Sequence, residues 1–206
     1  DMGRYSESLS NYEKALEILQ KSFPSDHPDL ATTYGNIGLV YSDMGRYSES
    51  LSNHEKALEI RQKSFSPDHP DLATIHNNIG SVYSKMGRYS ESLSNYEKAL
   101  EILQKSFPPD HPNLATIHNN IGSVYSKMGR YSESLSNYEK ALEIQRKSLP
   151  VDHPDLARTQ NNIGWIYYEM GRYSESLWNH EKAFEIQRKS LPPDHPDLAR
   201  THNNIG

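Results

Sequence analysis

Apolar residues along the chain recur at steps of three and four, and this spacing predicts α-helices. A first stripe, starting at Pro70, consists of Leu72, Ile75, Ile79, Val82, Tyr83 and Met86. A second stripe consists of Tyr89, Leu93, Tyr96, Ala99, Leu100, Leu103 and Phe107. Gly87 lies between them, and glycine readily takes the left-handed conformation that often follows the last turn of a helix. We therefore expect two helices, the A helix and the B helix, joined by a tight turn at 86–88.

This pair of helices is repeated along the chain with a period of 42 residues. The block Met-Gly-Arg-Tyr-Ser-Glu-Ser-Leu begins at Met2, Met44, Met86, Met128 and Met170. A fixed period of this size predicts units that bury their apolar faces against their neighbours. We expect a single array over 1–206, cut from a longer one, with repeats at 28–69, 70–111, 112–153 and 154–195 between partial repeats at 1–27 and 196–206.

Composition excludes several classes of partner. The formal charge of −5 and the isoelectric point near 6.1 leave no basic stripe for a phosphate backbone, so we expect no nucleic acid partner. Apolar runs are too short for a membrane-spanning helix, and we expect no membrane contact. The sequence has no cysteine, which is compatible with a reducing compartment, and the cytoplasm is the expected location.

Several residues of the repeat resemble a known signature. Ile79-Gly80-x-x-Tyr83, Gly87-x-Tyr89, Tyr96 and Ala99 are similar to the tetratricopeptide repeat. The period exceeds the usual length of about 34 residues. With the motifs His-Pro-Asp-Leu-Ala-Thr and Glu-Lys-Ala-Leu-Glu-Ile, it resembles the longer repeats of kinesin light chains. The expected fold is an all-α, right-handed superhelical solenoid of antiparallel helix-turn-helix repeats.

Histidines are the first candidates for chemistry. Three pairs are seven residues apart: His69 and His76, His111 and His118, and His195 and His202. That spacing separates the two side chains by roughly 10 Å along a helix, too far for two ligands of one zinc ion. We therefore expect no metal site and no cofactor, and interpret these histidines as helix caps and packing residues.

Paired asparagines in the A helix are the second candidates. The first members are Asn77, Asn119, Asn161 and Asn203, and each is followed by a second asparagine. Asparagine is a poor helix former, but its carboxamide can donate to and accept from the backbone of an extended peptide. The family resemblance implies that A helices line a concave groove that holds peptides. We expect the first asparagine of each pair to face this groove; the alternative, which we favour for the second, is a hydrogen bond to the neighbouring repeat.

Positions on the A helix that differ between copies are the third candidates. Trp165 stands where other copies have Leu39, Ser81 or Ser123, and Tyr168 stands where they have serine. Arg158 replaces a threonine, and Lys85 and Lys127 align with Asp43 and Glu169. Aromatic residues and arginine are frequent anchors of binding surfaces. We therefore include Arg158, Trp165, Tyr168, Lys85 and Lys127 in the candidate groove; neutral variation on a solvent-exposed face is the alternative.

The expected function is a non-catalytic scaffold that binds extended or partly helical peptides. The sequence pairs no nucleophile with a base and contains no glycine-rich phosphate loop, so we expect no enzymatic activity. The alternative is self-association. Residues 1–22 form a B helix without its A helix, residues 198–206 begin an unpartnered A helix, and such complementary ends can stack head to tail.

Overall fold

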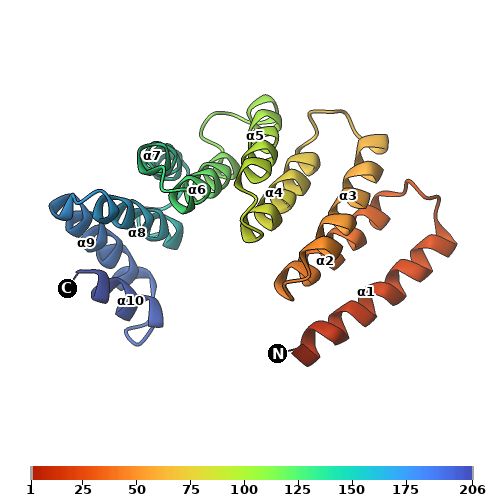
Figure 1. Ribbon diagram of the computed structural model, residues 1–206, viewed down its shortest axis with the longest axis horizontal. Helices are drawn as coiled ribbons and strands as arrows, with labels where there is room; N and C mark the ends of the chain where they lie inside the picture. Colours follow the sequence, from red (N-terminus) through yellow and green to blue (C-terminus); the bar gives the residue numbers. More distant parts are fainter. Residues whose placement is uncertain (1, 206) are drawn as a thin grey trace. The chain divides into compact units, whose positions relative to one another are not determined.

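Helices account for every regular element in residues 2–205, the part of the chain that this computed structural model describes (Figure 1). The A helices are α2 (Pro28–Asp43), α4 (Pro70–Lys85), α6 (Pro112–Lys127), α8 (Pro154–Glu169) and α10 (Pro196–Ile205). The B helices are α1 (Met2–Ser22), α3 (Tyr47–Ser64), α5 (Tyr89–Ser106), α7 (Tyr131–Ser148) and α9 (Tyr173–Ser190). The all-α class and the helix-turn-helix repeat are thereby confirmed.

The chain forms two compact units, residues 1–106 and residues 107–206. In unit 1, α2 pairs with α3 and α4 pairs with α5, while α1 packs on α2 and α3 packs on α4. Unit 2 repeats this scheme: α6 pairs with α7, α8 pairs with α9, α7 packs on α8 and α9 packs on α10. The division into 42-residue repeats within a single array stays a prediction.

Each A helix from α2 to α8 begins with the same local structure. Proline occupies the first turn, and the preceding histidine is the N-cap. Its Nδ1 accepts a hydrogen bond from the backbone N–H two residues on, at 3.3 Å from His27 and 3.1 Å from His153. This bond satisfies one of the donors that a helix start leaves free. The capping role predicted for these histidines is confirmed.

Glycine ends the A helices as predicted. Gly45, Gly87, Gly129 and Gly171 have φ between 71° and 75°, in the left-handed region. A side chain in that conformation would be strained, whereas glycine enters it without penalty. The turn therefore reverses the chain within three residues, and the following B helix packs back on its own A helix.

A second glycine lets the two helices of a hairpin approach closely. A Cβ built on Gly80 would lie 2.9 Å from the ring of Tyr96, which is only 3% exposed. At the same crossing the hydroxyl of Ser92 donates to the carbonyl of Gly80 at 2.7 Å. The hydroxyls of Ser50 and Ser134 make the same bond. Serine in the B helix is thus small enough for the close crossing, and its buried hydroxyl has a partner.

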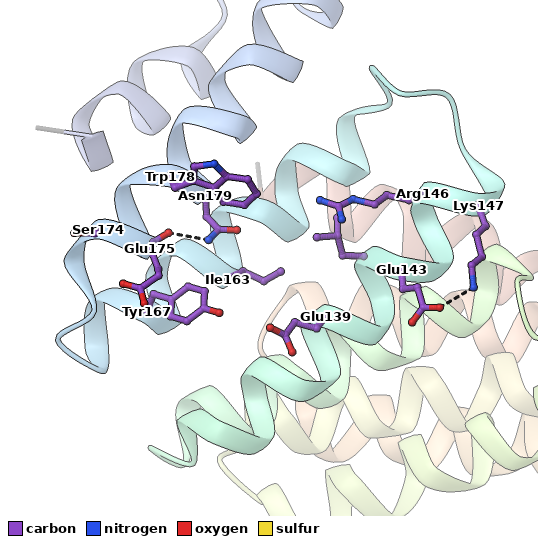
Figure 2. Close-up of a pocket in the computed structure, with 11 residues that line it drawn as sticks. Glu139, Glu143, Arg146, Lys147, Ile163, Tyr167, Ser174, Glu175, Trp178 and Asn179 are labelled. Carbon is purple, nitrogen blue, oxygen red and sulfur yellow. Dashed lines mark hydrogen bonds and ion pairs between the residues drawn. The ribbon is translucent and has the colours of Figure 1, made fainter.

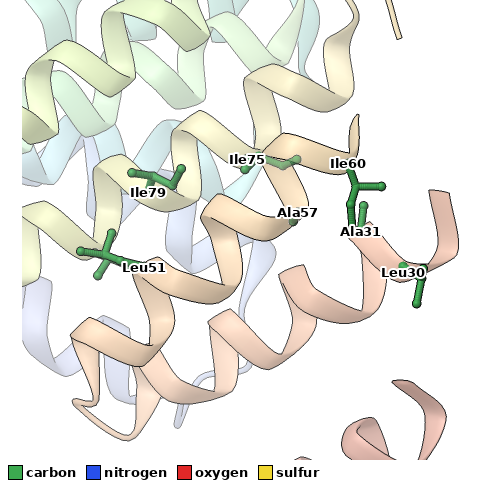
Figure 3. Packing of buried hydrophobic residues seen from close by; sticks show 8 residues of the cluster. Leu30, Ala31, Leu51, Ala57, Ile60, Ile75 and Ile79 are labelled. Carbon is green, nitrogen blue, oxygen red and sulfur yellow. The ribbon is translucent and has the colours of Figure 1, made fainter. Parts of the chain in front are cut away.

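Apolar side chains from successive helices form the core of each unit. In unit 1 the cluster comprises Leu30, Ala31, Leu51, Ala57, Ile60, Ile75, Ile79 and Val82 (Figure 3). In unit 2 it comprises Tyr138, Leu142, Leu156, Ile163 and Ile166. Both clusters draw residues from two consecutive hairpins, because one hairpin alone cannot cover its own apolar stripe.

The opposite faces of the B helices are polar. Glutamate and lysine four residues apart form ion pairs between Glu59 and Lys63 at 2.7 Å and between Glu143 and Lys147 at 2.6 Å. Glu185 pairs instead with Lys182, three residues before it, at 3.0 Å. Such exposed pairs contribute little to stability because water screens them, so they mark a solvated surface rather than a functional site.

Candidate functional site

The A-helix face of unit 1 is formed by α2 and α4. Lys85 on α4 donates to the hydroxyl of Ser42 on α2 at 2.9 Å, and its ammonium lies 3.5 Å from the carboxylate of Asp43. The lysine side chain is nevertheless 40% exposed. Lys85 therefore joins two neighbouring A helices and still presents its ammonium to solvent.

In unit 2 the first asparagine of a pair connects neighbouring A helices. Asn119 on α6 accepts a hydrogen bond from the hydroxyl of Thr159 on α8 at 3.2 Å, and the asparagine side chain is buried. Asn161 on α8 donates to the hydroxyl of Thr201 on α10 at 2.9 Å. The amide oxygen of Asn161 also lies 2.9 Å from Nδ1 of His180. Because this oxygen can only accept a hydrogen bond, Nδ1 of His180 carries the proton.

These contacts differ from the roles expected for the paired asparagines of the A helices. A hydrogen bond to the neighbouring repeat was the alternative that we favoured for the second asparagine, and in unit 2 the first asparagine makes it. Asn77 is half-buried, Asn203 is exposed near the end of α10, and Lys127 is exposed. Peptide binding by these residues stays a prediction, and for Asn119 and Asn161 it requires side chains that already bond within the unit.

Two of the predicted aromatic residues come together on α8. The rings of Trp165 and Tyr168 stack with centroids 5.8 Å apart, and Tyr173 on α9 meets Tyr168 edge to face at 5.6 Å. Trp165 is 52% exposed and Tyr168 is 54% exposed. Arg158 belongs to the same helix but pairs with Asp155 at 3.0 Å in the first turn. The candidate groove thus contains an exposed aromatic pair, with the arginine held at the other end of the helix.

A buried residue of the B helix varies together with the A-helix residue at the position equivalent to Trp165. Where the A helix has Ser81 or Ser123, the B helix has Tyr96 or Tyr138, and each tyrosine hydroxyl hydrogen-bonds to that serine. Where the A helix has Leu39 or Trp165, the B helix has His54 or His180. Leu39 has no polar atom with which a tyrosine hydroxyl could pair, so a tyrosine at position 54 would bury an unpaired hydroxyl.

The remaining histidines hold structural positions. Nδ1 of His76 lies 3.0 Å from the amide oxygen of Asn95, and His118 makes the matching contact with Asn137 at 3.1 Å. Burial lowers the pKa of both imidazoles, because the charged form would lose its hydration. Throughout residues 2–205, no group of three or more histidine, aspartate or glutamate side chains could hold a metal ion.

A pocket of unit 2 was missed by sequence reasoning. It lies between α7, α8 and α9 and has a volume of about 760 Å³ (Figure 2). Trp178 forms part of its wall and is 51% exposed. The signal was present in the sequence, because the other copies have Ser52, Ser94 and Ser136 at this position.

The fold and the candidate surfaces define a class: an array of helical hairpins that presents extended A-helix and B-helix faces. The tetratricopeptide-repeat family model matches residues 1–63, 29–105, 71–147 and 113–188. The chain therefore belongs to the tetratricopeptide-repeat family, whose members are generally non-catalytic scaffolds for protein–protein interactions. A comparison with curated proteins gives no match.

Solved structures share this fold. BtubC (BKLC) from P. vanneervenii has a TM-score of 0.81 at 24% identity, over 95% of this chain and 77% of that protein. A putative kinesin light chain from Podosopora anserina with nearly identical TPR-like repeats has a TM-score of 0.77 at 22% identity, over 91% and 89%. The apo form of RapI has a TM-score of 0.78 at 22% identity, over 90% and 65%. The predicted likeness to kinesin light chain repeats is confirmed at the level of the fold.

Within residues 2–205, no helix combines the length and the apolar character that a bilayer crossing needs.

Proposed function

We propose that this chain is a scaffold that binds extended or partly helical peptides on the exposed face of its A helices. The observation that carries the proposal is the stacked pair Trp165 and Tyr168 on α8, each more than half exposed. Apolar rings of this size are usually covered in a folded protein unless they serve a contact. Aromatic side chains also dominate the energetics of peptide and protein recognition.

Charged residues of the A helices would orient a bound peptide. In unit 2, Lys127 on α6 and Arg158 on α8 present exposed side chains, and in unit 1, Lys85 on α4 does so. Such a cation can pair with a carboxylate of the ligand, although pairs that remain exposed contribute little affinity. The carboxamides of Asn77 and Asn203 can also donate to and accept from a peptide backbone. Asn119 and Asn161 would have to exchange their inter-helix bonds for bonds to the ligand.

Replacing the aromatic pair should weaken peptide binding. The double variant Trp165→Ser/Tyr168→Ser carries the residues that other copies have at these positions, Ser81 and Ser84, so we expect the fold to tolerate it. Peptides selected by the unmodified chain from a random dodecapeptide library should bind the double variant roughly tenfold more weakly or worse. Isothermal titration calorimetry measures both affinities.

Val151→Ser is the matched control, because it also exchanges an exposed apolar side chain for the residue of another copy, Ser25, but in a loop outside the A helices. It should change the affinity less than about twofold, the usual effect of a substitution outside a contact. Equal binding by the unmodified chain and the double variant would contradict the proposed groove.

Head-to-tail self-association is a second candidate, favoured by two surfaces. Ile18 on α1 is 64% exposed, whereas the equivalent Ile60 is 8% exposed. Ala199 on α10 is exposed, whereas the equivalent Ala157 is 1% exposed. The two surfaces therefore correspond to those that internal repeats bury against each other, and a contact of this type need not close.

Sedimentation velocity distinguishes self-association from peptide binding by a monomeric chain. If the 206-residue chain stacks, its sedimentation coefficient should rise with concentration, and Ile18→Asp should abolish the rise by placing a charge in the contact. Val151→Asp is the control, because this loop valine is already 85% exposed. A coefficient that does not rise with concentration contradicts stacking and leaves the peptide-binding proposal unaffected.

A further inference from the structure

The pocket on the B-helix side of unit 2 has the dimensions of a binding site for side chains. Its volume of about 760 Å³ lies within the range of roughly 300–1,000 Å³ typical of ligand pockets. Leu142 and Ile163 supply apolar surface to its lining, and Tyr167 and Trp178 supply aromatic surface. Figure 2 shows Ile163 at the base of the space between Trp178 and Arg146. An occupant would therefore exchange water for contact with apolar and aromatic groups.

Trp178 sets this pocket apart from the equivalent positions of other repeats. Serine in the other copies could not form an aromatic wall. The indole is half exposed although Leu142 and Ile163 lie in the same pocket. Unit 2 thus keeps a large aromatic surface accessible beside an apolar base, the arrangement that favours an inserted ring.

Arg146 adds a second stacking partner. Figure 2 shows its guanidinium on the opposite side of the pocket from the indole of Trp178, with Ile163 below the space between them. Guanidinium groups and indoles both stack on aromatic rings. A ring entering this space would be covered on one face by the indole and on the other by the guanidinium.

Carboxylates along the rest of the rim favour a cation next to that ring. Glu143 is neutralised by Lys147 at 2.6 Å, and Glu175 shares its charge with Arg172 at 2.7 Å. Glu139 lies beside Tyr167, whose pKa is raised by burial and further by this negative charge. The side of the pocket around Glu139 therefore complements a positive group, while Arg146 disfavours one on the opposite side.

We propose that this pocket binds a protein segment that carries an aromatic and a basic side chain two positions apart. In an extended segment these two side chains point to the same side, about 7 Å apart. The aromatic ring lies between Trp178 and Arg146, and the ammonium or guanidinium lies beside Glu139. The site lies between α7, α8 and α9 and uses none of the residues of the proposed A-helix groove.

Fluorescence of Trp178 tests the proposal directly. The chain has two tryptophans, so Trp165→Phe leaves Trp178 as the single reporter. The probes are acetyl-Ser-Phe-Gly-Lys-Ser-amide and its versions with Ala for Phe and with Glu for Lys. Emission should change saturably with the first probe, and each altered probe should bind roughly tenfold more weakly, as expected for the loss of a stacked ring or a charge contact.

Two protein variants complete the test, with binding followed by the anisotropy of a fluorescein-labelled probe. Trp178→Ser should reduce the affinity roughly tenfold or more, and Arg146→Gln, which introduces the residue of the equivalent Gln62 and Gln104, should reduce it by a smaller factor. Circular dichroism confirms that both variants fold.

Three outcomes would overturn the proposal. The first is the absence of a saturable change with the Phe-Gly-Lys probe. The second is equal binding of the three probes, or equal binding of the Phe-Gly-Lys probe by the Trp178→Ser chain and the unmodified chain. The third is a change of Trp178 emission with protein concentration alone, because the occupant would then be a second copy of the chain. None of these outcomes depends on the A-helix face, where Trp165 and Tyr168 lie.

Discussion

Acidification from about pH 7.5 to about pH 4 is expected to reduce the free energy of unfolding by about 3 kcal/mol through His54 alone. This imidazole is fully buried between α2 and α3, and burial lowers its pKa from 6.5 to about 4. Between these two values the unfolded chain binds a proton that the folded chain excludes. The stabilisation is therefore complete above about pH 6.5 and is lost as the pH falls toward 4.

The neighbours of His54 explain why this histidine makes the protein sensitive to acid. Both of its ring nitrogens are buried and have no hydrogen-bond partner within residues 2–205. The equivalent His180 has Asn161 beside its Nδ1 at 2.9 Å, but the residue equivalent to Asn161 in the first hairpin is Gly35. Burial also lowers the pKa of His76, His118 and His180, so those imidazoles add to the acid sensitivity.

The double variant Leu39→Ser/His54→Tyr isolates the contribution of His54. It recreates the hydrogen-bonded pair of Ser81 and Tyr96, and tyrosine stays neutral over this pH range. Urea denaturation followed by circular dichroism at several pH values should show about 3 kcal/mol less acid destabilisation than in the unmodified chain. Identical pH profiles for the two proteins would contradict the assignment to His54.

The substitution Gly80→Ala is expected to destabilise the protein by about 2 kcal/mol, because it overpacks the crossing of α4 and α5. The new Cβ would lie 2.9 Å from the ring of Tyr96 and 3.2 Å from the backbone oxygen of Ser92. Tyr96 is buried, and Ser92 is held by its hydrogen bond to the same glycine, so neither neighbour can move aside easily. Thermal unfolding followed by circular dichroism measures the loss.

Gly35→Ala is the matched control within an A helix. A Cβ on Gly35 meets no atom within 4 Å, and this glycine does not have a positive φ. Alanine is the better helix former, so this variant should be more stable by roughly 0.5–1 kcal/mol. The same substitution should thus destabilise the protein at Gly80 and stabilise it at Gly35. Equal effects at both positions would show that helix propensity, and not the close crossing, determines them.

The sequence determined the local structure of this protein. Proline at the first turn, the histidine cap and the left-handed glycine act within a few residues, so the bounds of the helices could be predicted from sequence alone. The family resemblance rested on the same short-range pattern at a constant period. The need of Ser92 for a partner was also foreseeable, because a small polar residue in an apolar stripe must bond something.

The roles of individual side chains were decided by the tertiary structure. Asn119 and Asn161 follow the same helical pattern as Asn77, yet they bond to threonines about one repeat away, at Thr159 and Thr201. Likewise, Trp178 takes part in a pocket only because α7 and α8 bring Leu142, Ile163 and Arg146 beside it. Helical periodicity specifies which face a residue occupies, but its partners depend on the helices that pack against that face.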